Sequence, residues 1–368
     1  MRPFKVALVE TSESAKAIPG WVREELEAEG IDFVVRGCDS RADLQAFASD
    51  SHLVWVWGSH VLTADRLRVL EKCGAILRSG SGTDNVPVSE ATKQRMLVVN
   101  TPGAVAQEVS DHAIAMLLAV VRQIVAQDRR VRTGVWEFHR ENNRWHLRGS
   151  TLGLIGFGHI AQLVAEKTKG FGVRTLVHDP WVPTDTIRSR GAEPVAFRTL
   201  LSQSDFITVH CPLTEATRHL IGEKEIGLMK AHAILINTSR GPIVDEAALA
   251  RALQEKRIGA AGLDVFEDEP LPVSSPLLKL ENVILTPHIA GYSDVFPGSF
   301  WRYSVESAIA IANGYWPRSV VNPNVEPRWP LRRRQWPPEV EIYKTREEEA
   351  AISDSGSAPD GTLRDDTG

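Results

Sequence analysis

Short apolar runs alternate with amphipathic stretches through about the first hundred residues of the chain. The runs are rich in β-branched and aromatic residues, as buried strands are, whereas the segments Val22 to Glu29 and Ala64 to Lys72 have helical periodicity. This alternation predicts a parallel sheet with helical crossovers. The five predicted strands are FKVALV at Phe4, DFVV at Asp32, HLVWVW at His52, AILR at Ala75 and LVVN at Leu97.

A second series of the same kind follows the polar stretch from Glu141 to Arg148. A chain of 368 residues exceeds the usual size of a single core. Together the two series predict an α/β fold with two doubly wound parallel-sheet domains. The strands of the second series are TLGLI, VRTLVH, DFITVH, AILIN, IGAAGLDV and NVILT.

A long amphipathic helix is predicted between the two series. Six apolar residues follow one another at spacings of 3, 1, 3, 1 and 3, which places them in one stripe along a helix. Two interpretations remain open: the stripe packs on the core of its own domain, or it contacts a second subunit. The stripe comprises Ala113, Met116, Leu117, Val120, Val121 and Ile124.

Beyond Pro327 the apolar periodicity ends. Residues 327–368 combine proline, serine, glycine and charge runs, so they bury too little apolar surface to offset the entropy cost of ordering. We predict that this tail is largely disordered. The run from Arg332 to Arg334 is either solvated or docked on an acidic surface.

Composition and charge exclude several classes of partner. The 42 lysines and arginines are outnumbered by 47 aspartates and glutamates, so no basic excess indicates a nucleic-acid or anionic-membrane partner. The three cysteines, Cys38, Cys73 and Cys211, are far apart and form neither a C-x-x-C pair nor a disulfide framework. A reducing cytoplasm fits this cysteine usage best.

The chain shows no segment of the kind that targets a membrane. Its start, MRPFKVALVE, reaches Glu10 before a signal-like apolar core develops. The longest apolar stretch, Ala113 to Val121, is too short to cross a bilayer. We therefore expect a soluble, unprocessed protein.

A glycine turn opens the second series. The strand TLGLI runs into Gly156-Phe157-Gly158-His159-Ile160-Ala161, a G-x-G-x-x-A pattern that continues into a helix. The first glycine permits a tight turn, the second lets a pyrophosphate approach the backbone, and the alanine allows close helix packing. The next strand ends at Asp179, eighteen residues after Ala161, where a carboxylate can bind a ribose hydroxyl. The segment predicts dinucleotide binding.

The cofactor predicted from this segment is NAD. Between Asp179 and Arg188 the chain carries no Arg or Lys that would neutralise the 2′-phosphate of NADP. The competing interpretation is a plain glycine turn followed by an ordinary strand-end aspartate. It has less support, because strand, turn, helix and acid occur here in the required order. No metal site is predicted.

Three later segments, NTSRGPIVDEAAL, GLDVFEDEPL and TPHIAG, follow predicted strands directly. The ends of parallel strands lie along one edge of a sheet, so Arg240, Glu269 and His288 are predicted to converge there. With this set of motifs in this order, residues 1–325 resemble the D-isomer-specific 2-hydroxyacid dehydrogenases. The tail beyond them lies outside the resemblance.

The resemblance implies a reaction and its catalytic residues. The reaction is NAD-dependent hydride transfer between the nicotinamide and C2 of a small 2-oxo or 2-hydroxy acid. Arg240 would hold the substrate carboxylate and carbonyl, a role that suits a planar, permanently charged guanidinium. His288 would be the acid and base, and Glu269 would hydrogen-bond it and favour its protonated form.

Further contacts are implied by the same resemblance. The segment Arg78 to Asn85 matches the family's substrate clamp, whose glycines leave backbone N–H groups free to cradle a carboxylate. Glu267 and Asp268 are expected to be solvated. The implied substrate contacts are Ser79, Gly80, Ser81, Arg240 and His288. The implied cofactor contacts are Gly156, Phe157, Gly158, His159, Ile160, Asp179, Pro180, Cys211, Pro212, Thr217, Thr238, Ser239, Arg240, Asp264, His288, Gly291 and Ser81.

The resemblance also implies a division into domains. Residues 1–100 and 287–326 would form a flavodoxin-like substrate-binding domain, and residues 101–286 a Rossmann NAD-binding domain, with the active site in the cleft between them. Hinges are expected near Asn100 and Pro287. A homodimer through the cofactor domain is implied as well, which favours the second-subunit interpretation of the apolar stripe.

Two alternatives to reduction of a small 2-oxo acid remain. Phosphoglycerate dehydrogenases of this family commonly carry an Arg where this chain has Trp57, although Arg78 could still meet a phosphate. This substitution favours glyoxylate, hydroxypyruvate, or branched and aromatic keto acids over 3-phosphoglycerate. The second alternative is an NAD-responsive corepressor-type scaffold, which the near-neutral surface does not support.

Overall fold

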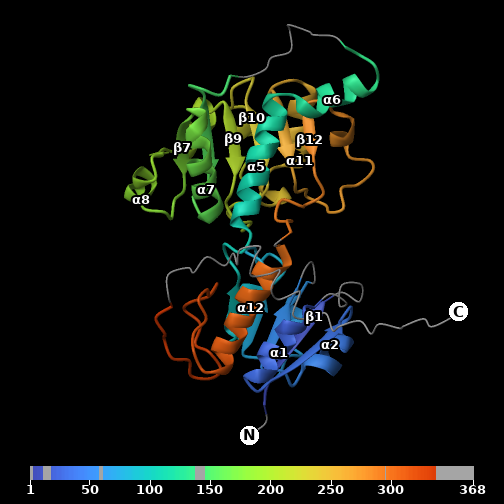
Figure 1. The fold of residues 1–368 in the computed structure, drawn as a ribbon, viewed down its shortest axis with the longest axis vertical. Coiled ribbons are helices and arrows are strands. Elements are labelled where there is room, and N and C mark those ends of the chain that lie inside the picture. The colour runs from blue at the N-terminus through green and yellow to red at the C-terminus, as the bar shows by residue number, and fades with distance from the viewer. Residues whose placement is uncertain (1–2, 11–17, 58–60, 137–145, 295, 337–368) are drawn as a thin grey trace, which may run out of the picture.

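The protein consists of two α/β lobes, each built on one parallel sheet (Figure 1). The computed structural model describes residues 3–10, 18–57, 61–136, 146–294 and 296–336. The N-terminal lobe contains a five-stranded sheet and the other lobe a seven-stranded sheet. The predicted fold class, two doubly wound parallel-sheet domains, is confirmed.

The first sheet has the strand order β2-β1-β3-β4-β5, which is the flavodoxin-like order. The inner strands β3 and β4 are almost entirely buried, as expected for a parallel sheet with both faces covered, whereas β2 at the edge alternates buried and exposed positions. Its strands are β1 Phe4–Glu10, β2 Ile31–Gly37, β3 Leu53–Val56, β4 Ala75–Arg78 and β5 Leu97–Asn100. Its helices are α1 Gly20–Ala28, α2 Arg41–Ala48, α3 Ala64–Leu67 and α4 Val88–Lys93.

The chain returns to this sheet through α12, Phe296–Ala312. The helix packs against α1 and β4, and Trp301 stacks its ring on Trp57 with centroids 3.8 Å apart. A buried hydrogen-bond chain runs from Trp55 Nε1 to Ser79 Oγ (2.7 Å) and on to Ser304 Oγ (2.8 Å). A segment from the far end of the sequence therefore completes the first core.

The second sheet has the order β12-β11-β10-β9-β6-β7-β8. The strand order reverses between β6 and β9, and ligands of such sheets bind in the crevice at this point. Its strands are β6 Thr151–Ile155, β7 Arg174–His178, β8 Glu193–Pro194, β9 Phe206–Val209, β10 Ile234–Asn237, β11 Ala260–Leu263 and β12 Val283–Leu285. Its helices are α7 His159–Thr168, α8 Thr184–Ser189, α9 Phe197–Gln203, α10 Glu223–Ile226 and α11 Glu246–Gln254, with 3-10 turns η1 Lys169–Phe171, η2 Gly241–Ile243 and η3 Pro276–Lys279.

Helix α5, Ala106–Val121, packs on the second sheet and on α7. The apolar stripe from Ala113 to Val121 is buried in this core, so the core-facing interpretation is correct for it. The second-subunit interpretation holds for none of these residues. Only Ile124, at the start of α6 (Ile124–Arg132), is exposed, at 55%.

Among the described residues no single helix is both long and apolar enough to span a membrane. Helices α5 and α6 pass such a test only as a pair, and a bend of 59° separates them.

The predicted start of the disordered tail at residue 327 is wrong. The Arg328 guanidinium donates to the carbonyls of Gln94 (2.9 Å) and Glu71 (2.6 Å). The Trp329 ring lies edge-on to Phe4 and fills the space where a side chain on Gly74 would lie. The side chains of Arg328 and Trp329 are half-buried, and burial of such single side chains leaves no periodic pattern in the sequence. Residues 337–368 lie outside the described part of the chain.

The arginines of the 332–334 run lie against aromatic rings. Arg332 lies over the Tyr315 ring at 4.5 Å, Arg333 over Trp316 at 4.2 Å, and Arg334 over Trp336 at 4.3 Å. Guanidinium groups stack well on such rings because the ring face is electron-rich. The three arginines are exposed, as the solvated-run interpretation expected, but their stacking on aromatic rings was not predicted.

Candidate active site

The glycine turn after β6 has the geometry that a dinucleotide requires. Gly156 adopts a left-handed φ of 88°, and a Cβ there would lie 2.8 Å from the Cys211 backbone nitrogen. Only glycine tolerates both the dihedral angle and the contact. The turn therefore lies directly against the loop after β9, at the point where the strand order reverses.

Gly158 leaves the N-terminus of α7 open. It is the N-cap residue, no side chain caps the helix, and a Cβ on Gly158 would meet nothing within 4 Å. The first-turn N–H groups of an α-helix have no partner within the helix, so the N-terminus of α7 is suited to bind an anion. A hollow of about 230 Å³ beside the helix is lined in part by His159 and Gly103. The residues present fit the pyrophosphate of a dinucleotide.

Asp179, the predicted ribose ligand, also orders the glycine turn. Its Oδ2 accepts a hydrogen bond from the Phe157 N–H (2.7 Å), and its Oδ1 accepts from the N–H groups of Trp181 and Val182. A carboxylate oxygen accepts two bonds, so Oδ2 keeps one position for a ribose hydroxyl. Pro180 begins the exposed turn that follows.

The loops after β9 and β10 form the other wall of the crevice. The Ser239 hydroxyl donates to the Cys211 carbonyl, and the Thr217 hydroxyl donates to the Pro212 carbonyl at 2.6 Å. Burial raises the pKa of the Cys211 thiol to about 11, so this thiol is a neutral contact surface.

Thr238 has a buried hydroxyl without a hydrogen-bond partner among the described residues. Such a group is costly unless a ligand or water completes it. Its position directly after β10 fits a bound cofactor.

Asp264 is fully buried at the end of β11. Its Oδ1 accepts from the Thr286 hydroxyl (2.6 Å) and from the Ile289 N–H (2.9 Å), and its Oδ2 accepts from the Ala290 N–H (2.9 Å). One acceptor position on Oδ2 thus remains for the predicted nicotinamide contact. Farther along this segment, a Cβ on Gly291 would lie 3.3 Å from the side chain of Val105.

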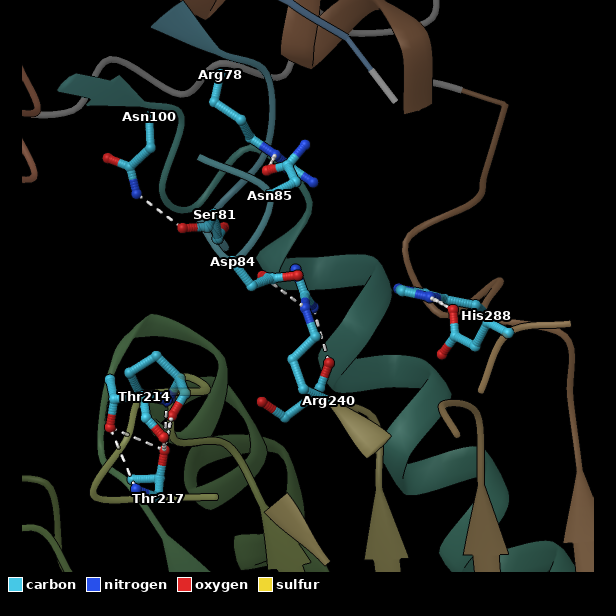
Figure 2. Close-up of polar contacts among 12 residues, drawn as sticks. Arg78, Ser81, Asp84, Asn85, Asn100, Thr214, Thr217, Arg240 and His288 are labelled. Atoms are coloured by element: carbon cyan, nitrogen blue, oxygen red, sulfur yellow. Dashed lines mark hydrogen bonds and ion pairs between the residues drawn. The ribbon is translucent and has the colours of Figure 1, made fainter. Parts of the chain in front are cut away.

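His288, labelled in Figure 2, forms a hydrogen bond with Glu269. His288 Nδ1 lies 2.6 Å from Glu269 Oε2, and the Phe266 N–H donates to Glu269 Oε1 at 3.0 Å. Burial alone would raise the pKa of Glu269. The hydrogen bonds from His288 and Phe266 and the Arg240 charge outweigh burial and lower this pKa. The ionised carboxylate accepts a hydrogen bond from Nδ1–H of His288, which leaves Nε2 of His288 to face a substrate.

Arg240 projects from the loop after β10 toward the first domain (Figure 2). Its Nε donates to Asp84 Oδ1 at 3.0 Å and its Nη1 to the Ser239 carbonyl at 2.8 Å. A Cβ on Gly82 would lie only 2.1 Å from Nη2, so in the observed arrangement this glycine leaves the space that the guanidinium occupies against the clamp loop. Because the Arg240 charge also acts on Glu269, the three predicted catalytic residues share one site.

In the clamp loop, an N–H group that was predicted to be free is hydrogen-bonded. The Ser79 N–H donates to the Val56 carbonyl, and the Gly80 N–H donates to Thr101 Oγ1 at 2.6 Å. The Gly80 N–H is therefore not available to a carboxylate, which contradicts the prediction for this glycine. The Ser81 carbonyl accepts from Asn100 Nδ2 at 2.8 Å.

In the acidic stretch after β11, Glu267 is exposed, as predicted, and it also has polar partners. Glu267 Oε1 accepts from the Glu246 N–H (3.0 Å), and it lies 3.0 Å from His219 Nε2. Glu267 thereby satisfies an N–H in the first turn of α11. Asp268 is exposed, as expected.

Sequence reasoning missed Asp84, Thr101 and His112. Asp84 pairs with Arg240, Thr101 holds the clamp loop, and His112 Nε2 lies 3.1 Å from Thr286 Oγ1. Asp84 stood inside the clamp motif and could have been noticed as the only carboxylate there. Thr101 and His112 carried no local signal, because their partners are distant in sequence.

Comparison with known proteins identifies the family of this chain. Residues 114–290 match the model of the D-isomer specific 2-hydroxyacid dehydrogenase NAD binding domain. The glyoxylate reductase of Thermococcus litoralis is 44% identical over 262 residues, which are 69% of this chain and 78% of that protein. The chain belongs to the D-isomer specific 2-hydroxyacid dehydrogenase family.

Two solved structures extend the match to both lobes. One is the NADPH-dependent glyoxylate/hydroxypyruvate reductase of Sinorhizobium meliloti with NADP and malonate (TM-score 0.77, 30% identity, 90% of this chain and 100% of that one). The other is the D-lactate dehydrogenase of Aquifex aeolicus with NAD and lactic acid (TM-score 0.74, 28% identity, 84% and 96%). This 2-hydroxyacid dehydrogenase is thus an oxidoreductase that acts on CH–OH donors with a nicotinamide cofactor.

Proposed function

We propose that this 2-hydroxyacid dehydrogenase reduces a small 2-oxo acid of the glyoxylate or hydroxypyruvate class with NADH. The observation that carries the proposal is the His288–Glu269 pair, bonded at 2.6 Å, in one site with Arg240. The name of the Thermococcus relative supports glyoxylate as the first substrate to test.

The residues divide the reaction between them. The guanidinium of Arg240 binds the substrate carboxylate and polarises the C2 carbonyl. When bound, the nicotinamide supplies the hydride. His288 donates the Nε2 proton to the carbonyl oxygen, and Glu269 stabilises the protonated imidazole through Nδ1. Because Asp84 bonds Nε of Arg240 and the Ser239 carbonyl accepts from Nη1, Nη2 is the nitrogen best placed for substrate.

We further propose NAD as the preferred cofactor. The Asp179 carboxylate at the ribose position would repel a 2′-phosphate. Arg188 is committed to Asp185 on its own helix at 3.3 Å. We expect a KM at least about tenfold lower for NADH than for NADPH, which corresponds to a difference of about 1.4 kcal/mol in binding free energy.

Assays of NADH oxidation with a panel of 2-oxo acids test the proposal. The panel comprises glyoxylate, hydroxypyruvate, a branched keto acid, phenylpyruvate and 3-phosphohydroxypyruvate. Turnover of the first two, together with a loss of about 10²- to 10⁴-fold in His288→Ala, is the expected result. NADH binding, followed by fluorescence, without turnover of any panel member would instead support the corepressor-type scaffold.

One observation favours the phosphorylated panel member. Arg78 places a second guanidinium in the clamp, where its Nη1 donates to the Ser79 carbonyl at 2.6 Å. Burial, and then the Arg240 charge, lower the pKa of Arg78 to about 10, so it stays charged at neutral pH. Against this, the indole of Trp57 stacks on Trp301 and offers no charge to a phosphate.

We also propose a homodimer formed through α6. None of the helix's residues is buried, and Ile124 and Val131 are 55% and 50% exposed. In Figure 1 the helix extends from the edge of the second lobe. Burial of these side chains in a second copy would remove apolar surface from water. Light scattering of the double variant Ile124→Glu/Val131→Glu is expected to show monomers where the native protein shows dimers.

A further inference from the structure

His288 occupies a backbone conformation that its surroundings must hold. Its φ is 55°, in the left-handed region, which residues other than glycine rarely adopt. A residue other than glycine keeps this backbone conformation only where contacts with its neighbours hold it there. The position of the imidazole therefore depends on whatever holds the turn from Thr286 to Ala290.

Asp264 holds this turn at three successive N–H groups. Its backbone carbonyl accepts from the His288 N–H at 2.8 Å, and its carboxylate accepts from Ile289 and Ala290, both at 2.9 Å. The carboxylate is fully buried, so its charge depends on the hydrogen bonds that it accepts. The geometry of the His288 turn is therefore set by how firmly Asp264 itself is fixed.

Helix α5 contributes His112 to the hydrogen-bond network of Asp264. A carboxylate oxygen accepts hydrogen bonds, so the Thr286 hydroxyl donates its single proton to Asp264 Oδ1 at 2.6 Å. Thr286 Oγ1 then has to accept at 3.1 Å from His112 Nε2, which must carry a proton. His112 Nε2 also lies 3.6 Å from Asp264 Oδ1, and its side chain is 22% exposed. The donors form one chain from His112 through Thr286 to Asp264.

We propose that His112 is a positioning residue for His288, acting through Thr286 and Asp264. This inference rests on the proposed function of His288 as proton donor. Hydrogen bonds in such a chain polarise and strengthen one another, so loss of the first donor weakens the hold on Asp264. Small displacements of a reacting group lower the rate strongly. His112 itself is not a catalytic residue.

Two substitutions at His112 separate hydrogen bonding from packing. His112→Leu keeps apolar bulk and removes the donor, whereas His112→Gln keeps an N–H donor at a similar reach. The matched control is Asp111→Asn on the same helix, which breaks an exposed pair with Lys167 (2.6 Å). We expect kcat to fall about 10- to 100-fold in His112→Leu with a much smaller change in KM for the 2-oxo acid. His112→Gln and Asp111→Asn are expected to stay within about threefold of the native kcat.

A second readout does not depend on turnover. Nuclear magnetic resonance of the imidazole ¹³Cε1 of His288, in protein without cofactor, reports the environment of the ring during a pH titration. We expect the His288 resonance and its titration midpoint to shift in His112→Leu, and to stay native in His112→Gln and Asp111→Asn. If His112→Leu does not fold, Thr286→Val removes the middle hydroxyl at nearly constant volume and is expected to give the same shift.

The outcomes are distinct. Native kcat and native His288 resonance in His112→Leu or Thr286→Val overturn the inference. An equal loss in His112→Gln and His112→Leu also overturns it, since the donor would then be irrelevant. If the native protein turns over no 2-oxo acid, the proposed function fails, while the resonance of His288 still decides whether His112 positions its turn.

Discussion

Two glycines of the same turn are expected to respond in opposite ways to one added methyl group. Gly156 has a φ of 88°, and a Cβ would meet the backbone of Cys211 at 2.8 Å. Gly158 has φ and ψ of −72° and −169°, which alanine adopts freely, and a Cβ would meet nothing within 4 Å. Gly156→Ala should therefore affect folding, and Gly158→Ala should affect cofactor binding.

The magnitudes follow from the two environments. In Gly156→Ala the left-handed conformation costs about 1–2 kcal/mol, and backbone shifts to relieve the contact cost about 1–3 kcal/mol more. Together these costs are about 2–5 kcal/mol, and at about 2–4 °C per kcal/mol for a domain of this size the melting temperature should fall by about 4–20 °C. In Gly158→Ala the free energy of unfolding should stay within about 0.5 kcal/mol of the native value, or rise slightly. The methyl group would instead occupy the space that the pyrophosphate needs, and we expect the Kd for NADH to rise about 10- to 100-fold.

Differential scanning calorimetry and fluorescence titration with NADH measure the two effects separately. Binding of NADH to Gly158→Ala within about threefold of the native Kd would refute the placement of the pyrophosphate over this turn. A native melting temperature in Gly156→Ala would show that the backbone contact with Cys211 is relieved without cost.

Three further predictions concern charged groups. Arg240→Lys should raise KM for the 2-oxo acid at least about tenfold in steady-state assays, because an ammonium lacks bidentate geometry, and unchanged saturation would contradict the contact. Glu269→Gln should lower kcat about 10- to 100-fold while NADH binding stays native, since only the support of His288 is lost; a native kcat would show that His288 acts alone. Burial alone would raise the pKa of Asp205, but hydrogen bonds from Lys230 and His232 (2.7 and 2.8 Å) outweigh it and lower this pKa. Asp205 therefore stabilises the fold above its ordinary pKa of 3.8 and loses this contribution as pH falls through the lowered value. In urea unfolding, Asp205→Asn should lose less stability on acidification than the native protein does. An unchanged dependence of stability on pH would count against the pairing.

Part of the site could be predicted from the sequence because the relevant residues lie close together in it. The Gly156–Asp179 segment places turn, helix and acid within one β-α-β unit, so spacing alone predicted their joint role. Arg240, Glu269 and His288 each follow a strand, and the topology of a parallel sheet brings strand ends together. The predicted strands of both series are all present in the structure.

Other features depended on contacts that no pattern encodes. The error at residue 327 arose because Arg328 and Trp329 dock on a surface formed by the opposite end of the chain. The expectation that the Gly80 N–H is free failed because Thr101, on a different strand end, accepts its hydrogen bond. Hydrogen bonds of this kind depend on distances of a few tenths of an ångström, which residue type does not specify.

The amino-acid sequence by itself determined the two sheets and the glycine turn, since these follow from periodicity and from residue chemistry within short spans. The roles proposed for Arg240, Glu269 and His288 came from the family resemblance of their motifs. Only the tertiary structure decided that Asp84 meets Arg240 across 156 positions and that His112 reaches Asp264 through Thr286. The physical reason is that hydrophobic patterning fixes which face of an element is buried, whereas the pairing of polar groups depends on how separately formed elements pack. Steric fit and the need to satisfy each buried donor and acceptor settle that packing.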